Sequence, residues 1–196
     1  MNMKRIMLTM GCLLVQIAVC FGQQADFAKA VAKYKNSTAM SAQVTKTVHK
    51  DALTQDVVSQ GTLQMKSPSE VTISTDNGSS QLIMQGSKFT MVNEGKSRTT
   101  SSETNPQFAT FQTVFESILA GGSIDISQLT DLKITQEGKS MTLTITPEAA
   151  DKKQARRMMF TSFTLTIDTA TAALLKLRMN ERGGFTEYKF TDFKFQ

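Results

Sequence analysis

Short stretches in which apolar and polar residues alternate make up most of the chain beyond residue 40. Ala42, Val44 and Val48 are apolar and are separated by polar residues, which is the pattern of a strand with one buried face. Further stretches are separated by turn residues, such as those at 76–78 and 93–95. The pattern predicts strands at 40–49, 61–65, 71–73, 81–85, 89–92, 133–136, 141–145, 158–167, 174–179 and 185–195.

A segment near the start of the chain has helical spacing instead. Phe27, Val31 and Tyr34 lie at positions i, i+4 and i+7 and form one apolar stripe. Asp26 precedes this stripe and is the type of residue that caps a helix. We therefore expect a short helix that begins at Asp26 and packs its stripe against the sheet.

The middle of the chain predicts a second and more apolar helix. Asn105 is a capping residue, Pro106 fits the first helical position, and two glycines at 121–122 favour the end of the helix. Between them, apolar residues recur at helical spacing: Phe108, Phe111, Phe115, Ile118 and Leu119. A weaker helical turn is expected at 126–129, a hydrated loop at 97–105 and a charged connection at 147–157.

These elements together predict one fold class, mainly β with helices. Roughly nine or ten strands at short spacing indicate an antiparallel meander. Two amphipathic helices must bury their apolar faces, and the sheet offers the surface for this. We expect a curved antiparallel sheet, an open or half β-barrel, with a helical lid over its concave face.

The N-terminal 22 residues have the pattern of a signal peptide. Lys4 and Arg5 precede an uncharged apolar run at 6–21 that is too short for a stable membrane anchor. Small residues before Gln23 favour cleavage there and secretion into the periplasm. The alternative is a lipid anchor at Cys20, although the preceding Val19 is bulky for a lipobox.

Composition narrows the functional classes. Both cysteines, Cys12 and Cys20, lie in the leader, so the remaining chain has no thiol chemistry. The rest of the 196-residue chain suits a single domain at 23–196. A net charge of +5 includes two basic leader residues and is too small to indicate nucleic acid as a partner.

The most continuous apolar alternation supplies the candidate ligand-binding residues. Methionine suits surfaces that accommodate varied apolar partners, and the chain has 12 Met and 12 Phe but no Trp. The candidates for an apolar cavity are Leu63, Met65, Val71, Ile73, Leu82, Met84, Phe89 and Met91, with Phe108, Phe111, Phe115 and Ile118 on the lid helix. The alternative for each residue is ordinary core packing.

The inventory for catalysis is poor. His49 is the single histidine and the one candidate base, and no nucleophile elbow or phosphate loop accompanies it. Its neighbours Lys46, Lys50 and Asp51 are typical of a solvated strand end. No cluster of metal ligands is evident, so we expect neither an enzyme nor a metal or cofactor site.

Four basic residues form the densest charge cluster. Lys152, Lys153, Arg156 and Arg157 are candidates for contact with anionic headgroups or with an acidic receptor surface. A solvated loop is the alternative, since Glu148 and nearby acidic residues dilute the cluster.

Four segments, in the same order along the chain, resemble motifs of the LolA family of lipoprotein carriers. Residues 40–48 (MSAQVTKTV) are similar to that family's opening strand, and residues 60–68 (QGTLQMKSP) to its G-x-L-x-x-K-x-P strand and turn. Residues 85–92 (QGSKFTMV) resemble its D-G-x-x-x-x-x-Y hairpin, and residues 163–168 (FTLTID) its later strand before a turn. The resemblance extends over nearly the whole mature chain.

The resemblance implies an open β-barrel whose interior holds the acyl chains of a lipoprotein in transit from the inner to the outer membrane. The implied partners are lipoprotein acyl chains or a similar lipid, an inner-membrane release transporter and an outer-membrane acceptor. We further expect a monomer and a lid, at 105–120, that covers the empty cavity and moves aside for cargo.

Two departures from the family pattern favour a divergent branch with other cargo. Family members have an arginine before the proline of the strand-turn motif, where it tethers the lid, and this chain has Ser67. A serine cannot make that bidentate contact. The chain ends at 193–196 without the family's additional C-terminal strand and loop, so we expect delivery to differ.

Two other non-enzymatic functions stay open. One is a carrier of another lipid or apolar ligand, and the other is an envelope interaction module whose sheet edge or convex face binds a protein. In a module of this kind the concave side is packed solid, and periodicity does not separate a filled core from a cavity. Extractable lipid in the purified protein would distinguish the two.

Overall fold

The computed structural model describes residues 23–66, 68–149 and 151–196. The predicted leader at 1–22 and the departure at Ser67 lie outside the described residues. Within the described ranges, no helix combines the length and the apolar character needed to cross a bilayer.

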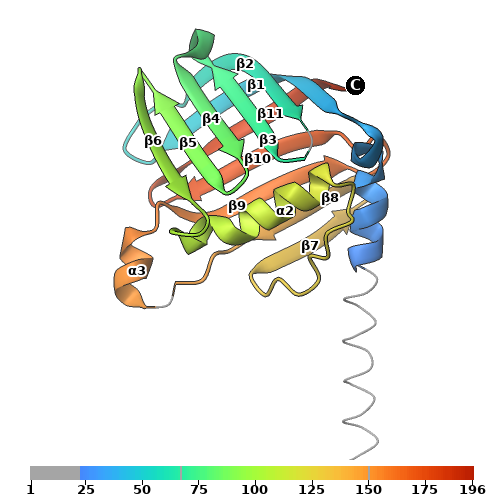
Figure 1. The fold of residues 1–196 in the computed structure, drawn as a ribbon. Coiled ribbons are helices and arrows are strands. Elements are labelled where there is room, and N and C mark those ends of the chain that lie inside the picture. The colour runs from blue at the N-terminus through green and yellow to red at the C-terminus, as the bar shows by residue number, and fades with distance from the viewer. Residues whose placement is uncertain (1–22, 67, 150) are drawn as a thin grey trace, which may run out of the picture.

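One antiparallel sheet of 11 strands forms the body of the described chain, in the order β6-β5-β4-β3-β2-β1-β11-β10-β9-β8-β7. It consists of two meanders that join where the first strand pairs with the last (Figure 1). The strands are β1 (Ala39–Lys50), β2 (Val57–Lys66), β3 (Glu70–Thr75), β4 (Ser80–Gln85), β5 (Lys88–Asn93), β6 (Lys96–Ser101), β7 (Leu132–Glu137), β8 (Ser140–Ile145), β9 (Phe160–Asp168), β10 (Leu174–Glu181) and β11 (Gly184–Phe195).

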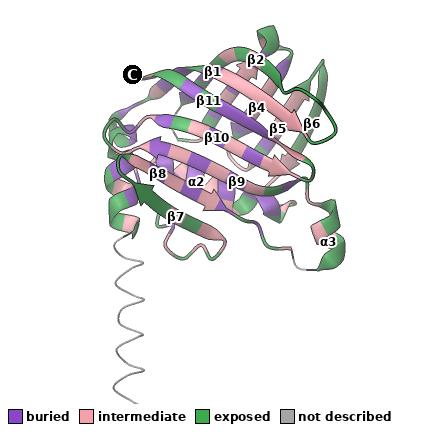
Figure 2. Cartoon of the chain, turned by 180° about the vertical axis from the view of Figure 1, so that it is seen from behind, coloured by how far each residue is buried: buried purple, intermediate pink, exposed green. Residues whose placement is uncertain are grey.

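Alternation along most strands gives the sheet an apolar concave face and a polar outer face. In β1, Met40, Ala42 and Val44 are buried, while Ser41 and Gln43 between them are more exposed. Buried and partly exposed residues therefore alternate along the strands (Figure 2). Helix α2 (Ala109–Leu119) lies across the concave face (Figure 1). The predicted open sheet with a helical lid is confirmed.

The N-terminal helix packs its predicted stripe into the core. Residues 23–31 are α-helical and continue into the 3₁₀ helix η1 (Ala32–Asn36). Phe27, Val31 and Tyr34 are fully buried. The prediction that Asp26 caps this helix is wrong, because the helix already includes residue 23, and Asp26 instead lies 3.8 Å from Lys29.

The predicted central helix is present with a 3₁₀ start. The 3₁₀ helix η3 (Pro106–Phe108) leads directly into α2. Asn105 occupies the N-cap position, as predicted, but its side chain caps no backbone N–H and instead accepts a hydrogen bond from the side chain of Gln107 at 3.0 Å.

Three local predictions differ from the structure. The loop expected at 97–105 begins as strand β6, whose sequence KSRTTS has no apolar residue to mark it. The charged connection contains helix α3 (Lys152–Arg157), capped by Asp151, which accepts a hydrogen bond from the Gln154 N–H at 2.7 Å. The helical turn expected at 126–129 is a simple turn, closed by a hydrogen bond from the Leu129 N–H to the Ile126 carbonyl oxygen at 3.2 Å.

The 3₁₀ helix η2 (Asp76–Gly78) occupies the predicted hairpin turn.

A bulge near the end of β11 changes which residues face the concave side. The register between β1 and β11 shifts between Ser41 and Gln43, and Asp192 has a φ of 52°. A one-residue bulge reverses the alternation of side chains beyond it. Phe193 and Phe195 consequently face the same side as Phe190, and both rings contact Tyr34, at 6.2 and 5.0 Å.

Candidate functional site

The candidate cavity residues all lie on the concave face, in a single core cluster. Seven of them are almost fully buried, and Met91 is partly buried against the same cluster. The four lid candidates on η3 and α2 are buried in this cluster as well. The structure therefore brings the 12 predicted residues together, and their role in ligand binding stays a prediction.

A second wall of the interior comes from β8 to β11. Its residues alternate in the same way as those on β2 to β5, where all the predicted cavity residues lie. Phe160 and Phe163 of β9 are buried and directly contact the lid. The other buried side chains of this wall include Met141, Leu143, Ile145, Leu165, Ile167, Leu177 and Phe190.

Aromatic rings hold the lid helix against both walls. Phe108 stacks on Phe89 of β5 with ring centroids 4.7 Å apart. Phe111 stacks on Phe163 of β9, also at 4.7 Å, and contacts Phe115 at 5.2 Å. Stacked and tilted aromatic pairs of this kind stabilise packing beyond the area they bury. The lid thus fills the half-barrel as part of its core.

The gap between the lid and the first half of the sheet is too small for a ligand. The gap between α2 and strands β3 to β5, bordered by Val71, Met84, Phe89 and Phe115, has a volume of about 10 Å³. A single water molecule needs about this much room. An acyl chain can enter this region only if the lid helix moves.

Polar contacts fix the lid near its start. Gln107 is buried, and its Oε1 accepts a hydrogen bond from the Phe160 backbone N–H at 3.1 Å. Thr110 Oγ1 donates to Asp131 Oδ1 at 2.7 Å. Sequence reasoning missed both contacts, because the partner residues are remote in the chain. The one local hint in the sequence is that Gln107 is a polar residue within the apolar helical segment.

Two glycines fix the other end of the lid. Gly121 and Gly122 have positive φ angles of 65° and 78°. A Cβ atom at Gly122 would lie 2.5 Å from the Cα atom of Ala28, and one at Gly121 would lie 2.6 Å from the Cβ atom of Lys35. The end of α2 therefore packs directly on the N-terminal helix, which is possible only because these positions lack side chains.

An open cleft continues the concave face beyond the lid. Its volume is about 250 Å³, and its apolar walls include Leu82, Met91, Met159, Phe160 and Met179. This volume is close to the lower end of the range of about 300–1,000 Å³ for ligand sites. In this cleft a ligand has space without movement of the lid.

Lys46 lies in this cleft, contrary to the prediction of a solvated strand end. It lines the cleft together with Val48, and only 14% of its side chain is exposed. Burial lowers the pKa of the Lys46 ammonium, and the nearby Asp76 carboxylate partly offsets this effect.

His49 faces the outer side of the sheet, away from the cleft, because it follows the cleft residue Val48 in β1. Its Nδ1 lies 2.7 Å from Asp56 Oδ1, and its Nε2 lies 3.3 Å from Asp51 Oδ1. The hydrogen bond to Asp56, together with the charges of both carboxylates, raises the pKa of His49. The ring also stacks on Phe185 at 5.0 Å.

The four basic candidates lie on α3, and all are exposed. The helix precedes Met159 and Phe160, which line the cleft, so the basic residues lie close in sequence to its border. Contact with headgroups or a receptor stays a prediction. No group of three or more potential metal ligands occurs within the described ranges.

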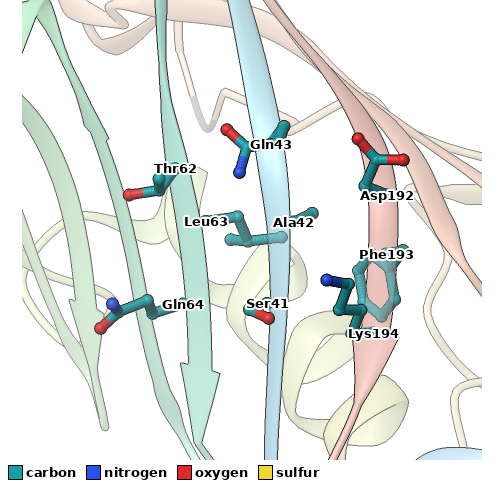
Figure 3. A pocket seen from close by; sticks show the side chains of 9 residues that line it. All are labelled: Ser41, Ala42, Gln43, Thr62, Leu63, Gln64, Asp192, Phe193 and Lys194. Carbon is teal, nitrogen blue, oxygen red and sulfur yellow. The ribbon is translucent and has the colours of Figure 1, made fainter.

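A second depression, of about 350 Å³, lies on the outer face at the bulge between β1 and β11 (Figure 3). The side chains of Ser41, Gln43, Gln64 and Lys194 border it, and they point away from the buried residues next to them in sequence. A surface this polar is poorly suited to an apolar ligand, so the cleft on the concave face is the better candidate site.

In a comparison with known proteins, the chain matches the model of one family. Residues 35–196 match the model of the family described as outer membrane lipoprotein carrier protein LolA. No curated protein sequence matches the chain.

Several solved structures have a similar fold at low identity. A domain described as lipoprotein-sorting, from Vibrio parahaemolyticus, is 11% identical with a TM-score of 0.47, and the match covers 90% of this chain and 93% of that chain. A LolA superfamily protein from Nitrosomonas europaea is 10% identical with a TM-score of 0.39, covering 88% and 93%. The lipoprotein LppX from Mycobacterium tuberculosis is 12% identical with a TM-score of 0.39, covering 88% and 94%.

The family match spans the whole sheet, the lid helix and the cleft. It begins in η1 and ends at the last residue of the chain. The chain belongs to the LolA family of outer membrane lipoprotein carrier proteins.

Proposed function

We propose that the protein is a periplasmic carrier that binds the acyl chains of lipoproteins beneath helix α2 and moves them from the inner to the outer membrane. The leader at 1–22 would direct the chain to the periplasm. An inner-membrane transporter would release cargo to it, and an outer-membrane acceptor would receive the cargo. Family membership supports an apolar ligand or a lipoprotein as cargo.

The observation that carries this proposal is a lid helix that packs into the concave face beside an open cleft. The lid buries its phenylalanines against both walls and leaves about 10 Å³ beneath it, while a cleft of about 250 Å³ adjoins it. Transfer of acyl chains out of water is favourable by about 0.8 kcal/mol per CH₂ group. Acyl chains would thus take the place of the lid's aromatic side chains on the same concave surface.

A test can lock the lid in place. Thr110 on the lid lies next to Asp131, whose backbone carbonyl accepts a hydrogen bond from Thr146 just after β8. Paired Thr110→Cys and Asp131→Cys substitutions would tie the helix to the sheet when oxidised. Native mass spectrometry of residues 23–196 would measure binding of a diacylated lipoprotein peptide and of the same peptide without its acyl chains.

We expect the reduced double variant to bind the acylated peptide one to one and the oxidised variant to bind much less. The Thr110→Cys variant alone is the control, and its binding should not depend on reductant. Equal binding by the locked and unlocked forms would overturn lid displacement.

One observation favours a second candidate function. The interior beneath the lid is filled, as expected for an envelope interaction module with a solid core. A folded protein that binds neither the acylated nor the deacylated peptide would support that module instead.

A further inference from the structure

Lys46 marks the place where the concave face of β1 changes from packed core to open cleft. The earlier residues on this face, Met40, Ala42 and Val44, are fully buried. Lys46 comes next, lines the cleft and is followed by Val48. A lysine on an apolar inner face requires a polar partner, because an uncompensated charge is costly to bury.

The partners that Lys46 has in the structure leave its charge incompletely balanced. Its Nζ donates a hydrogen bond to Ser80 Oγ at 2.7 Å, and Ser80 is neutral. The carboxylate of Asp76 lies 3.9 Å from Nζ and has 42% of its side chain exposed, so water screens the pair. The other carboxylate on this cleft, Glu181, is already paired with Lys50 at 2.5 Å.

Tyr188 adds a second polar group beside Lys46. The two residues are paired in register between β1 and β11, so their side chains share the concave face. Tyr188 is only 6% exposed and lines the cleft. No described residue forms a hydrogen bond with its hydroxyl. A hydroxyl that lines the cleft and has no hydrogen bond to a described residue is available to a ligand.

We propose that the cleft binds an amphiphile with an anionic end, either a carboxylate or a phosphate. The oxygens of this end would accept hydrogen bonds from the Lys46 ammonium and the Tyr188 hydroxyl. The acyl chain would lie along the apolar walls formed by Met91, Phe160 and Met179 and continue beneath the lid. The ammonium retains donors beyond the one that Ser80 accepts, so the anion need not displace this contact. This inference rests on the proposed function, because it assumes that the interior accepts an acyl chain.

The test compares amphiphiles that differ only at the polar end. Palmitate carries a carboxylate, palmitoyl lysophosphatidic acid a phosphate, and monopalmitoylglycerol no charge. Each would be titrated below its micelle concentration by intrinsic tyrosine fluorescence and native mass spectrometry. The proteins are the wild type, Lys46→Met, Lys46→Arg and Tyr188→Phe, all first checked for cooperative thermal unfolding.

We expect Lys46→Met to weaken binding of at least one anionic amphiphile about tenfold, which corresponds to about 1.4 kcal/mol, and to leave monopalmitoylglycerol unchanged. Lys46→Arg should retain most of the preference for the anion, and Tyr188→Phe should lose part of it. A merely structural role of Lys46 would instead change binding of all three ligands alike. Comparison of the two anionic arms identifies the headgroup as carboxylate or phosphate.

Failure of this inference and failure of the proposed carrier function would give different results. Equal binding of charged and neutral amphiphiles by the wild type and by Lys46→Met would overturn this inference and leave the proposed carrier function in place. An absence of binding by every acylated ligand, the lipoprotein peptide included, would overturn both. Should Lys46→Met fail to unfold cooperatively, the Lys46→Arg and Tyr188→Phe variants decide the outcome.

Discussion

Gly61 lies on the concave face of β2, where the backbone of β3 approaches it closely. It pairs with Val44 on one side and Thr75 on the other. A Cβ atom at this position would lie 1.9 Å from the backbone oxygen of Ser74. Glycine inside a strand often permits such a close approach of two backbones. The glycine of the G-x-L motif is therefore required for the close approach of β2 and β3.

Replacement of this glycine should destabilise the fold. We expect Gly61→Ala to lower the free energy of unfolding by roughly 3 kcal/mol, since β3 must shift to admit the methyl group. Gly86→Ala is the matched control: its φ is +53° but no atom lies within 4 Å of the added Cβ, so about 1 kcal/mol is expected. Urea unfolding measures both. Equal losses would contradict the role assigned to Gly61.

His49 predicts a pH-dependent contribution to stability. Its pKa in the folded protein is raised above the ordinary value, chiefly by the hydrogen bond to Asp56. The protonated form is therefore favoured by folding, and the stabilisation is complete below about pH 6.5 and lost as the pH rises through the raised pKa.

The variant His49→Gln should reveal this contribution. Its thermal midpoint should lie below that of the wild type at about pH 5.5 and coincide with it at about pH 9. The variant Asp56→Asn removes the principal partner and should reduce the same difference. A constant difference across this range would show that the histidine does not stabilise the fold through its charge.

The lid is an element held at both ends by contacts of different kinds. The N-terminal helix packs against the glycines that end α2, while the start of the lid is held by ring contacts of Phe108 and by side-chain hydrogen bonds of Gln107 and Thr110. Such side-chain contacts are easier to break than close backbone packing. We infer that the lid opens at its start, next to the cleft, and pivots at its end.

Gln107→Ala should loosen the lid. It leaves the buried N–H of Phe160 without a partner, which costs about 1–3 kcal/mol of folding stability. Because this cost falls on the closed state, the affinity for an acylated ligand should rise as the open state becomes more populated. Asn105→Ala is the control, since it removes only the second contact of Gln107.

Calorimetry of unfolding and titration with the acylated peptide would measure the two effects of Gln107→Ala together. A loss of stability without any gain in affinity would place the opening elsewhere in the lid.

Among the helices and strands, the sequence predicted those that have one apolar face. The strands with buried residues, the N-terminal helix and α2 were recognised by periodicity. Strand β6 was missed, because a polar edge strand is defined only by its hydrogen bonds to β5. The second wall containing Phe163 and the cleft position of Lys46 were missed too, because both depend on the pairing of β1 with β11.

For the molecule as a whole, the sheet and the lid should differ in stability. Central strands β1, β10 and β11 are paired on both sides, whereas the lid has tertiary contacts through side chains. We expect hydrogen exchange to be slowest in the central strands and faster in residues 106–119, with ligand changing exchange chiefly in the lid. Ligand-dependent exchange confined to the outer face, around Gln43, would contradict binding on the concave side.

The pairing of the first strand with the last has a further consequence for how the chain is made and folded. β1 emerges early, but its partner β11 is the last of the described strands. Until β11 has been made, the edge of β1 is therefore long, apolar on one side and open to pairing with other chains. A chain that stops short of β11 would expose the edge of β1 in the middle of the sheet, and we expect such a chain to aggregate.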